Sequence, residues 1–78
     1  MFVHHYRSEN PRGEPCYIAA FGRPLSEESD IRRWCCQTYG APGYRYDDDL
    51  IVWKDNIAFG EIEFARESDL SLFLLKWK

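Results

Sequence analysis

Residues 49–77, DLIVWKDNIAFGEIEFARESDLSLFLLKW, decide the fold of this chain because they predict two paired strands followed directly by a short helix. Leu50–Trp53 is a continuous apolar run rich in β-forming residues, and Ile57–Phe64 is a second such run. Asp55 and Asn56 lie between them and tolerate positive φ, which predicts a tight turn at these two residues. The rest of the chain is expected to pack around this unit.

Alternation along the second run predicts its two faces. Ile62 and Phe64 are expected on the core face, and Glu61 and Glu63 on the solvent face, since burying the carboxylates would be costly. Gly60 in the same run predicts a bulge or a close approach by the following helix.

The period then changes to that of a helix. Its apolar stripe comprises Leu70, Phe73, Leu74 and Trp77. Leu72 and Leu75 lie off this stripe, so the helix is apolar around most of its circumference. These two side chains are therefore candidates for a binding surface.

The N-terminal part predicts two more strands and another helix. Residues 2–6 and 16–21 are expected to be antiparallel strands joined by a loop at 7–15, which is rich in Pro and Gly. Ser26 is the expected N-cap of a helix over residues 27–39, which Gly40 ends. The order β-β-α-β-β-α predicts a single α+β domain over 1–78, with two helices on one face of an antiparallel sheet. This arrangement resembles a ferredoxin-like fold that lacks its last strand.

Composition limits the classes of protein. Aromatic residues make up 17% of the 78 positions, enough to fill a small core without a metal or disulfides. Three cysteines, two of them adjacent, are a poor disulfide framework and indicate a reducing compartment. No apolar run reaches about 18 residues and the N-terminus has no leader pattern, so a cytoplasmic protein without a membrane segment is expected. No cofactor motif is present.

Charge is distributed unevenly. Residues 1–46 carry six basic and five acidic side chains, whereas residues 47–78 carry four basic and eight acidic ones. This argues against direct binding of nucleic acid, which needs clustered Lys and Arg. The carboxylates expected to share an exposed side of the second hairpin are Asp47, Asp48, Asp49, Asp55, Glu61 and Glu63. They are either a solvated face or a docking surface for a basic patch on a protein partner.

Candidate chemistry is sparse. The run Asp47–Asp49 suggests a divalent-metal site, because hard cations bind carboxylate oxygens. Three consecutive acids, however, point to alternate sides of an extended chain, which favours a solvated turn. His4 and His5 cannot share a ligand sphere on a strand without a third partner. Cys36 follows two arginines that would favour its thiolate, yet it lacks a positioned base nearby in sequence, so an inert thiol is favoured.

The C-terminal part, residues 34–77, contains a set of recognisable positions. They are Trp34-Cys35, the following Gly40, the strand ending in Phe64 and the closing pattern Asp69-x-x-x-Phe73-x-Leu75-Lys76-Trp77. In these positions the chain resembles a group of small, mostly uncharacterised bacteriophage proteins. These are core and cap positions, so no catalytic residue is implied. The resemblance implies a protein made in a bacterial cytoplasm that binds a host protein or takes part in assembly.

The expected function is that of a non-enzymatic interaction protein that modulates a host protein through an acidic and apolar surface. A structural or assembly component of a phage particle is the alternative, and metal-dependent hydrolysis through Asp47–Asp49 is the third. Open sheet edges together with Leu72 and Leu75 further predict a homodimer.

Overall fold

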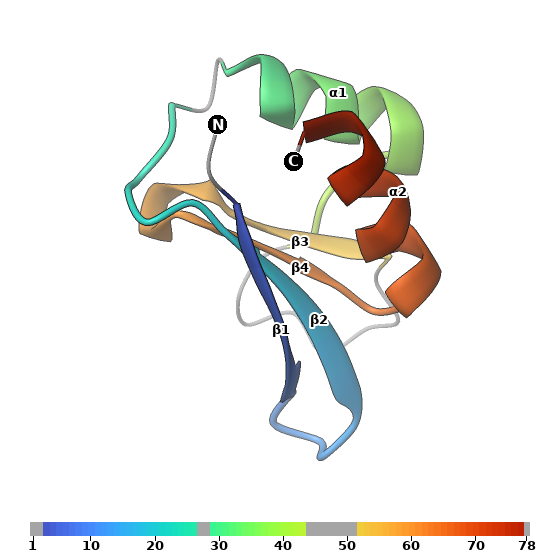
Figure 1. The fold of residues 1–78 in the computed structure, drawn as a ribbon. Helices are drawn as coiled ribbons and strands as arrows, with labels where there is room; N and C mark the ends of the chain where they lie inside the picture. Colours follow the sequence, from blue (N-terminus) through green and yellow to red (C-terminus); the bar gives the residue numbers. More distant parts are fainter. Residues whose placement is uncertain (1–2, 27–28, 44–51, 78) are drawn as a thin grey trace.

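The computed structural model describes residues 3–26, 29–43 and 52–77. Within these ranges lie the strands β1 (His4–Glu9), β2 (Pro15–Ala20), β3 (Trp53–Asn56) and β4 (Glu61–Phe64), the 3-10 helix η1 (Ile57–Phe59), and the helices α1 (Asp30–Tyr39) and α2 (Glu67–Trp77). The strands form one antiparallel sheet in the order β1-β2-β4-β3. Both helices cover the same face of this sheet (Figure 1). The predicted α+β architecture is confirmed.

The core lies between the helices and the sheet. Its fully buried side chains include Trp53, Ile57, Ile62, Phe64, Cys35 and Phe73. Aromatic rings fill the space between them: Phe64 and Phe73 lie 5.5 Å apart between centroids, and Trp34 lies 6.1 Å from Phe73. The predicted inward positions of Ile62 and Phe64 and the predicted apolar stripe of α2 are confirmed. Aromatic burial gives this small chain its core.

The first hairpin is longer than the sequence predicted. Residues 7–15 were expected to form an irregular loop, but β1 continues to Glu9 and the turn occupies only Asn10–Gly13. The Gly13 N–H donates to the Asn10 carbonyl at 2.9 Å, and the Asn10 side chain accepts from the backbone of Arg12 and of Glu14 at 3.0 Å. Asn, Pro and Gly occupy the first, second and fourth positions, as a type I turn prefers. This local chemistry holds β1 and β2 together as a ribbon.

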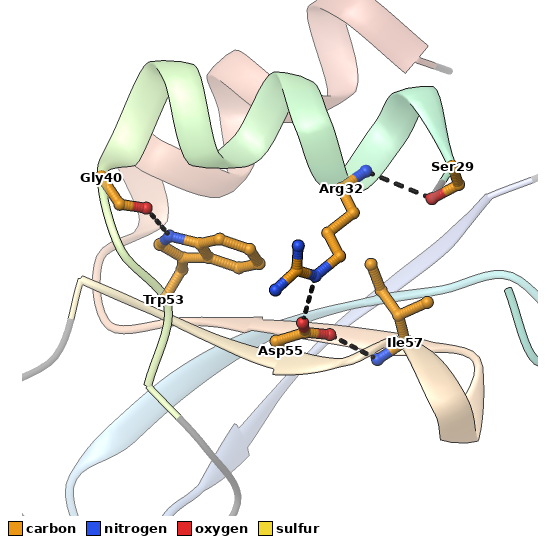
Figure 2. Close-up of polar contacts among 6 residues, drawn as sticks. All are labelled: Ser29, Arg32, Gly40, Trp53, Asp55 and Ile57. Atoms are coloured by element: carbon orange, nitrogen blue, oxygen red, sulfur yellow. Dashed lines mark hydrogen bonds and ion pairs between the residues drawn. The ribbon is translucent and has the colours of Figure 1, made fainter. Parts of the chain in front are cut away.

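Helix α1 begins three residues later than predicted. Ser29, not Ser26, is the N-cap, because its side chain accepts a hydrogen bond from the Arg32 N–H at 3.3 Å (Figure 2). Gly40 ends the helix as predicted, with φ of 90° and its N–H bonded to the Cys36 carbonyl. The part of the predicted helix at 27–28 lies outside the described residues.

The turn of the second hairpin is also displaced. Asp55 and Asn56 belong to β3, and η1 with Gly60 makes the turn instead. Gly60 has φ of 77°, and a Cβ there would lie 2.5 Å from the Arg23 carbonyl oxygen. The close approach predicted at Gly60 is therefore made by the backbone after β2 rather than by a helix. Residues 50–51 of the predicted first strand lie outside the described residues.

Candidate functional site

Strand β1 forms one edge of the sheet and is exposed along its whole length. All six of its side chains are exposed, and β2 is its only partner among the described strands. The Phe21 N–H bonds to Gly60 and the Asn10 N–H bonds to Glu14, which sets the alternation of hydrogen bonds along the ribbon. By this alternation the backbone groups of His5, Arg7 and Glu9 point away from β2. They are available to another strand.

A groove lies between β1 and the start of α2. It has a volume of about 400 Å³, and its lining includes His5, Arg7, Tyr17, Glu67 and Leu70. The structure gives Arg7 no ion pair with any described residue, and the same holds for Glu9. Both charges therefore remain accessible beside the outward backbone groups of β1.

The opposite edge, formed by β3, is tied to the end of α1 and the residues after it. Gly43 bridges this edge: its N–H donates to the Trp53 carbonyl and its carbonyl accepts from the Asp55 N–H, both at 2.9 Å. The fully buried indole of Trp53 donates from Nε1 to the Gly40 carbonyl at 3.0 Å (Figure 2). The outward carbonyl of Trp53 and the outward N–H of Asp55 therefore already have partners.

Asp55 does not join the acidic surface that the sequence predicted. It pairs with Ile62 in the sheet register and faces the helices, where one carboxylate oxygen lies 2.7 Å from Nε of Arg32. The other oxygen accepts from the Ile57 N–H at 3.2 Å (Figure 2). Only 8% of this side chain is exposed. Arg32 reaches down from α1 to this carboxylate instead of pointing to solvent.

Glu61 and Glu63 share the sheet face opposite the helices, as predicted, but each already has a partner. The Tyr6 hydroxyl donates to Glu61 at 2.5 Å, and this bond, with burial and the carboxylate charge, raises the pKa of Tyr6 to about 12. Lys54 Nζ lies 3.6 Å from Glu63. Of the predicted acidic surface, Asp47–Asp49 lie outside the described residues. Of the three predicted carboxylates among the described residues, two, Glu61 and Glu63, share a face.

The apolar candidates on α2 lie on its outer side. Leu72 is 44% exposed and Leu75 is 85% exposed, while Leu74 and Trp77 pack against the core. Their predicted position off the buried stripe is confirmed. They form a small apolar strip on the helix layer, and β1 lies in the sheet beneath that layer.

The described residues do not assemble a metal site. No group of three or more His, Cys, Asp or Glu side chains within them has a metal-binding arrangement. Cys16 and Cys35 are buried, and burial raises the pKa of the Cys35 thiol to about 12; Cys36 is half-buried. Neither described helix has the length and apolar character that crossing a membrane requires.

The sequence does not predict two features of the structure. The Pro and Gly residues at 7–15 predict a loop over the second half of β1, although the Asn-Pro-x-Gly pattern at 10–13 indicates a tight turn. The Arg32–Asp55 pair has no local signal, since its members lie 23 positions apart. No family model matches the chain, and neither a characterised protein nor a solved structure resembles it closely enough to be matched.

Proposed function

We propose that this chain is a non-enzymatic protein-interaction factor that contacts its partner by strand addition at the outer edge of β1. The supporting observation is the run of outward N–H and C=O groups at His5, Arg7 and Glu9 on a fully exposed strand. An added strand gains affinity from main-chain hydrogen bonds and specificity from alternate side chains. No proline interrupts β1.

Two further surfaces support binding of a protein. Leu72 and Leu75 offer apolar area; covering the largely exposed Leu75 contributes about 1.5–3 kcal/mol, and covering Leu72, which is 44% exposed, contributes less than half of that range. The acidic pair Glu61 and Glu63 contributes less than the sequence predicted, because both carboxylates have partners within the chain. A phage origin, a bacterial cytoplasm as its location and a basic surface on the host partner stay predictions.

The experiment replaces single residues of β1 by proline in the full chain. Arg7→Pro removes an outward N–H and leaves the bonds to β2, so we expect a folded protein that no longer captures partners from a bacterial lysate. Arg7→Ala is the matched control, because it removes the same side chain and keeps the N–H. We expect it to retain most of the capture.

Ser8→Pro provides the second control. Its N–H points toward β2, so this variant should unfold at a lower temperature than Arg7→Pro. If folded Arg7→Pro captured the same proteins as the parent chain in equal amounts, strand addition at β1 would be excluded.

A structural or assembly role is the second candidate, because pairing of exposed strands also joins copies within a particle. Mass spectrometry of purified phage particles tests it. Finding the chain there in amounts comparable with coat proteins would favour assembly over modulation of a host protein, and finding it only in the lysate would exclude it.

A further inference from the structure

We infer that the strand added to β1 is β1 of a second copy, in an antiparallel pair whose two-fold axis passes at Ser8. The inference rests on the proposed function, because it names the partner of the same edge. The joined sheets would be continuous, with the helix layers of both copies on one side.

Symmetry restricts the registers of such a pair. Directly opposite residues of antiparallel strands project their side chains to the same face. A two-fold axis perpendicular to the sheet therefore has to pass between two copies of one residue. Within β1, His4–Glu9, the axis can pass at His5, Tyr6, Arg7 or Ser8.

Charge separates these registers when His is counted as neutral. An axis at His5 or at Tyr6 then pairs no two charged side chains, because His5 lies opposite His5 or Arg7 of the second copy. An axis at Arg7 places the two arginines opposite each other and His5 opposite Glu9. Like charges directly opposite destabilise a strand pair. An axis at Ser8 instead places Arg7 opposite Glu9 of the second copy, twice by symmetry. This register alone pairs opposite charges.

The backbone is compatible with the Ser8 register. Arg7 and Glu9 are two of the three residues whose N–H and C=O groups point outward, so they would exchange backbone hydrogen bonds with each other across the axis. Both side chains are exposed and lack an ion pair with any described residue, so pairing them breaks no ion pair among the described residues. Each cross-strand ion pair contributes about 0.2–1 kcal/mol, which selects the register, while the backbone bonds supply most of the affinity.

The other edge makes this assembly end at two copies. Gly43 occupies the outward carbonyl of Trp53 and the outward N–H of Asp55 on β3, so β1 of one copy cannot pair with these two groups on another. An interface in which the same surface meets itself closes on a dimer rather than extending as a fibre.

Sedimentation equilibrium of the full chain, from about 10 µM to about 1 mM, tests the inference with charge exchanges. Arg7→Glu and Glu9→Arg each place like charges opposite each other, so each should raise the dimer dissociation constant by about tenfold or more. The double exchange Arg7→Glu with Glu9→Arg restores opposite pairs and should return the constant to within about threefold of the parent value. Arg12→Glu is the matched control, since it makes the same charge change in the turn outside the pair.

Hydrogen exchange identifies the interface independently. The amides of Arg7 and Glu9 should become protected as concentration rises, because they gain hydrogen-bond partners. A dimer indifferent to both single exchanges would overturn the inference, and Leu72→Glu with Leu75→Glu would then test an interface on α2. A parent chain monomeric at about 1 mM would also overturn it. If Arg7→Pro still lost its lysate partners in that case, the proposed function would stand without the dimer.

Discussion

The two edges of the sheet differ in what their neighbours provide. On β3 the outward carbonyl of Trp53 and the outward N–H of Asp55 are bonded to Gly43, and both side chains are held by α1 or the residue that ends it. On β1 every side chain is exposed, and no described strand lies outside it. Both edges are short, yet only one is closed. The difference shows that closure of an edge depends on segments distant in sequence rather than on the strand itself.

The two edges are expected to differ most in how much free energy of unfolding is lost when an aromatic side chain is removed. Trp53→Ala should lower the free energy of unfolding by about 3–5 kcal/mol, since it empties a fully buried site and leaves the Gly40 carbonyl without its donor. Tyr6→Ala on β1 should cost at most about 1 kcal/mol, because the side chain is exposed. Urea denaturation measures both. Equal losses would mean that the two edges contribute equally to stability.

Removing the charge of a carboxylate on either edge is expected to change the free energy of unfolding by a smaller amount. Asp55→Asn should cost about 1–3 kcal/mol, because it leaves the half-buried Arg32 without its counter-charge. Glu9→Gln on β1 should change the free energy of unfolding by no more than about 0.5 kcal/mol. Adding Arg32→Met to Asp55→Asn should recover part of the loss, since the unpaired charge is removed. No recovery in the double variant would show that the loss does not come from the unpaired charge of Arg32.

The smallest expected effect on stability comes from the hydrogen bond between Tyr6 of β1 and Glu61 of β4. The pKa of Tyr6 is raised to about 12, so the neutral phenol is favoured in the folded state. The resulting stabilisation is complete below about pH 10, the ordinary tyrosine value, and is lost as the pH rises through about 12. Glu61→Gln should shift one tyrosinate transition toward about pH 10 in an ultraviolet titration. Glu63→Gln is the control and should leave the Tyr6 transition unchanged.

Sequence periodicity predicted the layers of the fold well. The Ile62–Phe64 alternation and the apolar stripe of α2 follow from short-range geometry, and both occupy the predicted face. The turns were predicted less well. Asp55 and Asn56 have turn chemistry, but the left-handed Gly60 and the Arg32 contact place them in β3 instead. Of the candidate site, Leu72 and Leu75 were found by their helical phase. Asp55 was misplaced because its partner comes from a distant helix.

The strand order has a consequence for the speed of folding. Each hairpin joins neighbouring segments, and such ribbons form within microseconds but are only marginally stable alone. The pairing of β2 with β4 joins residues such as Ala20 and Glu61, which are about 40 positions apart. The entropy of closing this long loop is therefore lost before the contact contributes any stabilising free energy. We expect the pairing of β2 with β4 to limit the folding rate, and both helices to gain stability only once this pairing has formed. A chain cut between its two hairpins would then leave two fragments, each without the surface on which its helix folds.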